Sequence, residues 1–198
     1  AINVACPGQE VEGLSSVNAD FWHDVREMIR AKHGKDLPIL GWTGAGGDQS
    51  PHLMYRKRAE ERMRTLRKRT RLEELAARIV AAWNEAHEGA RQEQVAGAAL
   101  VHKIAPLELP PRIITEAEVA SARKNVETLS KDPRNQRVVL WHQEVIDRYK
   151  QQQEQSGTQA REPYRMELHV VRLGDVVIAT NPFELYTQYG IQMKARSR

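Results

Sequence analysis

The sequence predicts an α/β protein in which a mixed β-sheet is flanked by helices. Apolar runs of strand length alternate with amphipathic segments of helix length, and YRMELHVVRL-GD-VVIAT has the pattern of a β-hairpin that turns at Gly174-Asp175. Of the 198 residues, 40% are hydrophobic and 28% charged, as in an ordinary globular protein. We expect one α/β domain over residues 1–198.

The first part of the chain predicts two strands and two helices. AINVACP begins as a strand, and residues 17–33 predict a helix capped by Asn18, with apolar residues every three or four positions and Gly34 at its end. LPILGW predicts a short buried strand. A cationic helix is expected to begin near Pro51 or His52.

Two capping boxes mark the starts of later helices. Thr70 with Glu73 and Thr115 with Glu118 have the spacing at which side chains satisfy the first backbone amides of a helix. VAGAALVHKIAPLEL, which lies between the two boxes, predicts an extended segment. The boxes therefore predict two helices separated by a strand.

The last third of the chain predicts a helix, a loop, the hairpin and a final helix. Pro133 begins the first of these helices, and residues 151–163, QQQEQSGTQAREP, predict an exposed loop. The hairpin follows, and Pro182 is expected to open the last helix.

Composition restricts the classes of protein. The single Cys6 excludes an intramolecular disulfide framework and a Cys-rich zinc cluster within these residues. No apolar run approaches the ~20 residues that cross a bilayer, and the mean hydropathy is −0.62. The histidines are scattered and form no H-E-x-x-H or other compact zinc pattern.

Positive charge is concentrated in one segment. Between Met54 and Arg71 lie nine Lys or Arg and two Glu, a net charge of +7 in a chain of net charge +4. A helix over residues 56–71 could bind nucleic acid or an anionic surface, or could be a solvated face or a subunit contact in which Glu60 and Glu61 pair with Arg64. Because the segment has no aromatic residue after its start, we expect nucleic acid not to be the partner.

A glycine-rich stretch, GAGGDQSPH (residues 44–52), follows the second predicted strand, and we call it the serine loop. Backbone N–H groups such as those of Gly46 and Gly47 could hold an anion or a developing oxyanion. Ser50 is flanked by Asp48 and His52 at two-residue spacing. Two interpretations remain open: Asp48 and Ser50 cap the next helix, or Ser50, His52 and Asp48 take part in catalysis.

A second stretch, ATNPFELYTQYG, places Glu184 after a predicted strand and Pro182, at the expected start of a helix. A carboxylate at this position is stabilised by the helix dipole. It could equally be a metal ligand, and the residues alone leave both interpretations open.

These two stretches, in this order, resemble signatures of the neutral/alkaline (non-lysosomal) ceramidase family. GAGGDQSPH resembles the family's Gly-Asp-x-Ser-Pro-Asn, and GDVVIATNPFELYTQYG is similar to a later stretch in which a strand leads to Pro-x-Glu at a helix start. The opening ACPGQEVEGLSSVNADFWHDVREMIR is similar in layout to bacterial relatives of these enzymes. The resemblance covers most of the chain, but its specific residues are few: Gly47, Asp48, Ser50, Pro51, Pro182 and Glu184.

The resemblance implies a zinc-dependent hydrolase of carbon–nitrogen amide bonds, acting on a small-molecule or lipid amide. In the family, two His, one Glu and one Tyr hold the zinc; by position, Glu184 matches the glutamate and Ser50 the essential serine. A metal-bound water would attack the N-acyl carbonyl with Ser50 assisting. The resemblance also implies a fold like the family's N-terminal domain and a periplasmic or secreted location.

The chain also departs from the family's pattern. His52 replaces the family's Asn, and the zinc histidines and tyrosine have no match. The chain opens on Ala1 without Met, so we expect an incomplete domain with the remaining zinc ligands outside it. The alternatives to a hydrolase are a binding module that uses the cationic helix and a non-catalytic structural domain.

Overall fold

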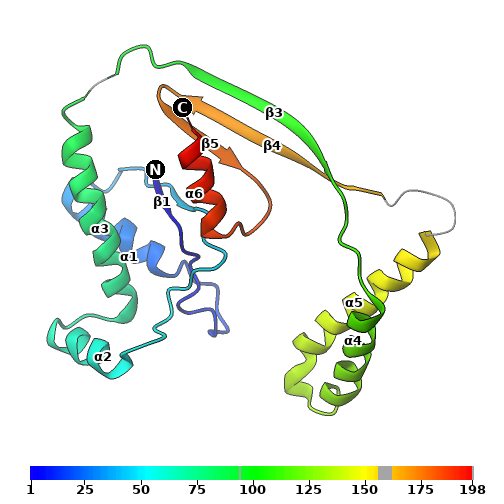
Figure 1. The fold of residues 1–198 in the computed structure, drawn as a ribbon. Helices are drawn as coiled ribbons and strands as arrows, with labels where there is room; N and C mark the ends of the chain where they lie inside the picture. Colours follow the sequence, from blue (N-terminus) through cyan, green and yellow to red (C-terminus); the bar gives the residue numbers. More distant parts are fainter. Residues whose placement is uncertain (94, 156–161, 198) are drawn as a thin grey trace. The chain divides into compact units, whose positions relative to one another are not determined.

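A computed structural model describes residues 1–93, 95–155 and 162–197 (Figure 1). Its elements in chain order are β1 (Ile2–Val4), α1 (Phe21–His33), β2 (Gly41–Thr43), α2 (Lys57–Leu66), α3 (Arg71–Ala90), β3 (Leu100–Leu109), α4 (Glu116–Leu129), a 3-10 turn (Pro133–Asn135), α5 (Gln136–Gln155), β4 (Tyr164–Leu173), β5 (Val176–Thr180) and α6 (Thr187–Arg196). The mixed α/β class is confirmed. Within the described residues, however, the strands form a parallel pair, β1–β2, and a separate antiparallel sheet, β3–β4–β5, instead of one mixed sheet.

The chain divides into two compact units. Unit 1 contains Ala1–Gly97 and Phe183–Arg198, and unit 2 contains Ala98–Pro182. The parallel pair lies in unit 1 and the antiparallel sheet in unit 2. The expectation of one domain over residues 1–198 stays a prediction.

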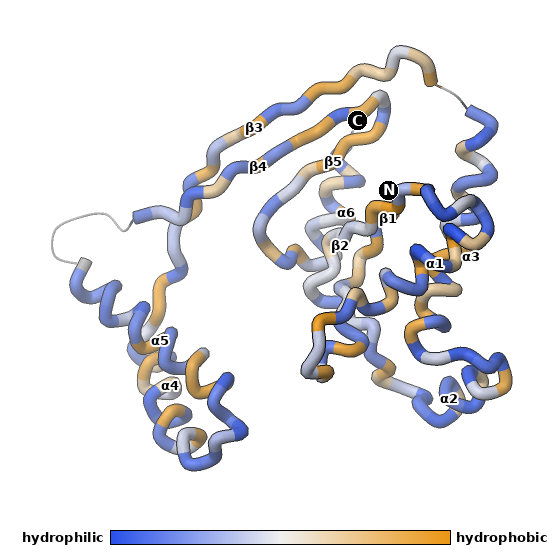
Figure 2. Tube along the Cα trace, turned by 180° about the vertical axis from the view of Figure 1, so that it is seen from behind, coloured by the Kyte–Doolittle hydropathy of each residue, from blue (hydrophilic) through white to orange (hydrophobic). Residues whose placement is uncertain are grey.

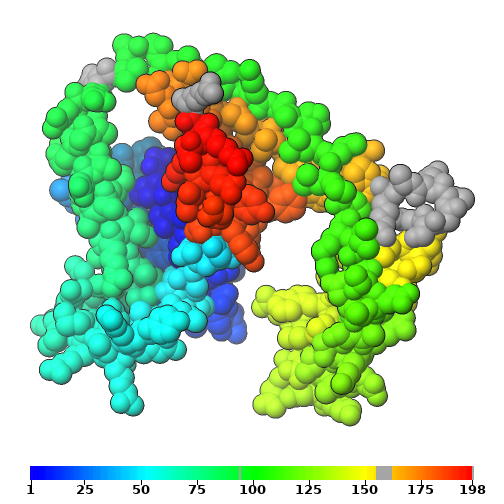
Figure 3. Space-filling view, viewed as in Figure 1, coloured from blue at the N-terminus to red at the C-terminus, as the bar shows by residue number. Residues whose placement is uncertain are grey.

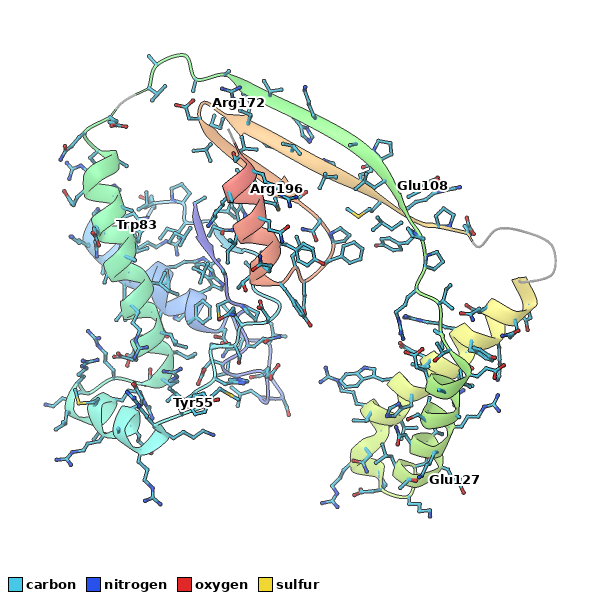
Figure 4. All side chains as sticks on the ribbon, in the orientation of Figure 1. Tyr55, Trp83, Glu108, Glu127, Arg172 and Arg196 are labelled. Carbon is cyan, nitrogen blue, oxygen red and sulfur yellow. The ribbon has the colours of Figure 1, made fainter. Side chains whose placement is uncertain are left out.

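The core of unit 1 lies between α1 and α3. Phe21, Val25 and Ile29 of α1 are at most 2% exposed and pack against Ala76 of α3. Near the end of this contact, Trp83 (Figure 4) stacks on His87 with the ring centroids 4.6 Å apart. The helix spacing of apolar residues therefore predicts this core correctly.

The start of α1 differs from the prediction. The helix begins at Phe21, and Asp20 is its N-cap in place of Asn18. The Asp20 side chain is buried and accepts hydrogen bonds from the backbone N–H groups of Phe21 (2.8 Å) and Val11 (2.9 Å). Asn18 instead accepts from the Asp20 N–H, and Gly34 ends the helix as expected.

The second strand and the cationic helix are both shorter than predicted. Of the predicted strand LPILGW only Gly41 and Trp42 lie in a strand, β2, which continues to Thr43 and pairs in parallel with β1. The cationic helix α2 begins at Lys57, not near Pro51 or His52. Pro51 lies in the loop before α2, and its carbonyl accepts a hydrogen bond from Arg71 Nη2 at 2.5 Å instead of taking part in a helix.

Both predicted capping boxes are confirmed. The Thr70 side chain accepts from the Glu73 N–H while Glu73 accepts from the Thr70 N–H, and Thr115 and Glu118 make the same two contacts at the start of α4. Each box satisfies two backbone amides that the helix itself leaves unpaired.

In unit 2, α4 and α5 pack as an antiparallel pair around Val119, Ala122 and Ile146, each at most 7% exposed. The Gln152 side chain of α5 both donates to the Ile114 carbonyl (2.8 Å) and accepts from the Ile114 N–H (2.9 Å). This side-chain amide fixes the segment that enters α4.

The antiparallel sheet of unit 2 confirms the predicted hairpin. β3 and β4 pair over ten residues each, and β4 turns into β5 through Gly174, whose φ of 58° favours glycine. Apolar and polar residues alternate along most of β4, whereas in β3, LVHKIAPLEL, they occur in short runs (Figure 2). Many apolar side chains of the sheet are exposed, among them Leu100 of β3 (72%) and Val176 of β5 (60%).

The loop predicted over residues 151–163 is wrong in its first part, because α5 continues to Gln155. The repeated Gln residues favour helix and extend it by more than one turn past the expected boundary. Residues 156–161 lie outside the described residues.

Candidate functional site

The parallel pair β1–β2 positions the serine loop. Gly44 continues the pairing beyond β2, since its N–H donates to the Val4 carbonyl at 2.8 Å. Beyond Gly44 the chain leaves β2, next to the last residue of β1, and turns through residues 45–50. All of these residues belong to unit 1, together with the segment that begins at Phe183.

Close backbone contacts explain two of the loop glycines. A Cβ on Gly46 would lie 2.5 Å from the Ala5 carbonyl carbon, and a Cβ on Gly47 would lie 2.5 Å from the Glu184 carbonyl oxygen. Neither glycine has a positive φ. They are therefore required by the neighbouring backbone, not by the conformation of the turn.

The serine loop and the segment of Glu184 lie directly against each other. The Gly47 N–H donates to the Leu185 carbonyl at 2.9 Å. This hydrogen bond occupies the Gly47 amide, which was predicted as an oxyanion donor together with that of Gly46. The contact joins the two stretches that resemble ceramidase signatures.

Asp48 caps a helix, but not the one that follows it in sequence. Its Oδ1 accepts from the Thr187 N–H at 2.7 Å and its Oδ2 accepts from the Thr187 hydroxyl at 2.8 Å, across 139 residues. These hydrogen bonds lower the pKa of the Asp48 carboxyl. In Figure 3 the cyan atoms of the loop lie against the red atoms at the start of α6.

The start of α6 corrects the prediction for the last helix. The helix begins at Thr187, not at Pro182, and residues 181–186 are irregular. The capping carboxylate is Asp48, so Glu184 does not stabilise a helix start. Glu184 is exposed, and its carboxylate makes no hydrogen bond or ion pair to the described residues.

Ser50 is exposed, and its hydroxyl oxygen accepts from the His52 N–H at 3.2 Å. The His52 ring contacts a different part of the chain. Its Nε2 lies 2.6 Å from the Gln9 carbonyl oxygen and 4.0 Å from Glu12 Oε1. Because a carbonyl only accepts, Nε2 carries the proton and Nδ1 keeps the lone pair that could take up a proton.

A cavity of about 360 Å³ opens beside Ser50 and His52. Apolar side chains such as Phe21 and Leu75 form much of its wall, and Cys6 and Arg71 add polar groups. Glu184 does not line it. Burial and the nearby acidic groups Asp20 and Glu10 raise the pKa of the Cys6 thiol, so a nucleophilic thiolate is disfavoured there.

Arg71 is the site residue that the sequence did not reveal. Its guanidinium pairs with Glu10 at 3.1 Å and holds the Pro51 carbonyl, and both side chains of the pair are at most 16% exposed. Within the described residues, Arg71 Nη1 and Glu10 Oε2 are buried without a hydrogen-bond partner. A cation in the first turn of a helix opposes the helix dipole, which is a signal that Arg71 has a specific partner.

Several cations of the basic segment are paired within unit 1. Arg67 and Arg69 of this segment approach the Glu74 carboxylate at 2.8 and 3.4 Å, and Arg78 of α3 approaches it at 3.3 Å; the Glu74 side chain is 5% exposed. Glu60 pairs with Arg78, not with Arg64 as the helical spacing predicts. The cationic segment is therefore in part a structural network around one buried acid.

Glu184 is the metal ligand that the sequence predicts at this site. Among residues 1–93, 95–155 and 162–197, no group of three or more His, Cys, Asp or Glu side chains is arranged to hold a metal ion. The described helices include none that is long and apolar enough to cross a membrane.

Comparisons with known proteins found no matching family model, no matching curated protein and no matching solved structure.

Proposed function

We propose that this chain contributes the serine loop and one metal ligand, Glu184, to a zinc-dependent amide hydrolase of the ceramidase-like superfamily. The observation that carries the proposal is the backbone contact between the serine loop and the segment of Glu184, in which Gly47 donates to Leu185 at 2.9 Å. A hydrolase of this kind needs its serine and its metal ligand close together, although they are far apart in sequence.

The local geometry gives Ser50 a substrate-binding role. Its hydroxyl oxygen accepts from the His52 N–H, so its own proton can be donated to the carbonyl oxygen of a substrate amide. The apolar wall of the adjacent cavity suits the acyl part of such a substrate. Asp48 positions this loop by holding it to the start of α6 and does not act on Ser50.

Glu184 fits a metal site in chemistry, since its carboxylate is exposed and unpaired among the described residues. Zinc would supply a Lewis acid that polarises the carbonyl or activates water. A single carboxylate does not complete such a site, and we derive no step through the metal.

The first test compares metal content and turnover in the intact protein. Ser50→Ala is expected to lower kcat/KM for an N-acyl amine by about 10²–10³-fold and to leave bound zinc unchanged. Glu184→Gln is expected to lose the zinc, whereas Glu88→Gln, an exposed acid in α3, should keep it. Full zinc content in Glu184→Gln would remove the ligand assignment, and full turnover in Ser50→Ala would remove the role of Ser50.

A second test addresses the contact itself. Gly47→Ala places a Cβ against the Glu184 carbonyl and should reduce turnover together with zinc affinity. Gly13→Ala is the matched control, because a Cβ there meets no atom within 4 Å and should change neither quantity. Equal behaviour of the two variants would show that the contact has no functional importance.

A further inference from the structure

Two histidines project from one face of the β3–β5 sheet. Ile104 pairs with His169 in the β3–β4 ladder, so His102, two residues earlier on β3, is the diagonal neighbour of His169 on the same face. His102 Nε2 lies 3.0 Å from His169 Nδ1, with the ring planes 19° apart. Glu108 and Arg172, labelled in Figure 4, lie towards the two ends of this ladder.

The Glu167 carboxylate lies close to one of the two rings. Its Oε2 lies 3.5 Å from His169 Nε2, two residues along β4 and on the same face. A carboxylate at Nε2 favours the tautomer with the proton on Nε2, which leaves the lone pair on Nδ1. That lone pair faces His102. A carboxylate that holds the outer nitrogen of an imidazole is the usual second partner of a histidine that binds a metal.

The separation of the two nitrogens suits one shared metal ion. With metal–nitrogen distances of about 2.0–2.1 Å, two imidazoles on a tetrahedral ion have nitrogens about 3.3 Å apart. The observed 3.0 Å differs little from this value, and rotation of the two side chains can redirect the lone pairs. When a metal takes the lone pair at His102 Nε2, the proton of that neutral ring moves to its Nδ1.

We propose that His102 and His169 form a binding site for a divalent metal ion, Zn²⁺ or a related late first-row ion, with Glu167 as a positioning residue. Imidazole suits Zn²⁺, Ni²⁺ and Cu²⁺, and the exposure of His102 leaves room for water to complete the coordination. The site lies in unit 2, whereas Glu184 lies in unit 1. Its proposed ligands therefore differ from Glu184, the ligand proposed for the hydrolase zinc.

A metal ion bound to both rings would crosslink β3 and β4. His102 and His169 are 67 residues apart, and the α4–α5 pair lies between them in the chain. An ion that binds both rings closes this long loop and is expected to stabilise the sheet in proportion to its concentration.

The test titrates Zn²⁺ into the Glu184→Gln form of the protein, so that the other proposed site does not contribute. Imidazole ¹⁵N chemical shifts report each ring, and calorimetry gives the affinity and stoichiometry. The ring signals of both His102 and His169 should shift together at one equivalent. His102→Ala and His169→Ala should each weaken binding more than tenfold, and Glu167→Gln should weaken it about 10-fold or more.

His23→Ala is the control, since His23 is exposed on α1 in unit 1 and should bind no ion in this way. Amide hydrogen exchange across β3 and β4 shows that each variant keeps its sheet. Ring signals of the unmodified pair that do not respond to Zn²⁺ would overturn the proposal without any variant. Equal affinity in His102→Ala and His23→Ala would also overturn it.

Discussion

The α1–α3 core of unit 1 buries its apolar side chains, whereas the β3–β5 sheet of unit 2 leaves many of its apolar side chains exposed. Phe21 and Val25 are at most 2% exposed between two helices, whereas Ile104 and Val176 are 51% and 60% exposed on the sheet. The first region is held by removal of apolar surface from water. The second is held by its ladder of backbone hydrogen bonds and by cross-strand pairs.

Two regular apolar patterns can therefore differ widely in the apolar surface that they bury and in their contribution to stability. The helix periodicity of α1 and the alternation along most of β4 are both regular, yet only the first leads to a closed core. Truncation of an apolar side chain should therefore cost much more in unit 1 than in the sheet, and the predictions below test this contrast.

The largest effect is expected in the core. Phe21→Ala should destabilise the protein by about 3–5 kcal/mol, because it removes a buried aromatic side chain and leaves a cavity. Ile104→Ala on the sheet should cost less than about 1 kcal/mol. Urea unfolding monitored by NMR measures both, and equal costs would contradict the comparison.

The next effect concerns the buried acid of unit 1. Glu74→Gln should cost about 1–3 kcal/mol, since it leaves Arg67, Arg69 and Arg78 without their shared carboxylate. The exposed Glu85→Gln on the same helix is the control and should change little. Chemical denaturation at pH 7 in low and high salt checks the result.

The same carboxylate predicts a pH dependence. Burial raises the pKa of Glu74, but the hydrogen bonds and charges of Arg69, Arg67 and Arg78 outweigh it and hold the pKa below its usual value. A lowered folded pKa stabilises the protein above the unfolded value of about 4.3, and this contribution is lost as the pH falls further. The stability of Glu74→Gln should therefore fall less steeply below that pH than the stability of the unmodified chain.

Loss of a helix N-cap is expected to have a smaller effect on stability, of equal size in the two units. Thr70→Ala and Thr115→Ala each remove one N-cap hydrogen bond and should each cost about 1 kcal/mol. The cost depends on the helix start and not on the surrounding core. Thr→Ser at both positions should restore most of it, and a large difference between the two Ala variants would show that a cap is coupled to its unit.

The smallest effect is a local titration in unit 2. Hydrogen bonds from the Thr115 N–H, Arg112 and the Thr115 hydroxyl lower the pKa of Glu118 to about 2. Arg112→Ala should raise it while the Thr115 contacts remain. Carboxyl ¹³C shifts followed from pH 6 to pH 1.5 measure the change, and an unchanged midpoint in the variant would contradict the contribution of Arg112.

Local chemistry could be predicted from the sequence, and distant contacts could not. The two capping boxes, the Gly174 turn and the apolar face of α1 depend on residues within a few positions of one another. The starts of α2 and α6 were misplaced, because Pro51 is held by Arg71 and Thr187 is held by Asp48. No spacing rule connects residues so far apart.

The candidate site shows the same division. The sequence singled out Asp48, Ser50 and Glu184, and the structure brings their two segments into backbone contact. The sequence did not indicate that the Gly47 amide would be occupied or that Asp48 would cap α6. Nor did it indicate that Arg71 and Glu10 would form a buried ion pair. Each of these depends on the packing of segments that are distant in sequence.

The bond from Asp48 to Thr187 also bears on the order of events during synthesis. Residue 48 leaves the ribosome long before residue 187, which lies 139 positions later. At a translation rate of about 5–20 residues per second, Thr187 is synthesised on the order of ten seconds after Asp48. For that interval the nascent chain carries the serine without the contact that anchors it, so the arrangement around Ser50 is assembled only after Thr187 has been synthesised.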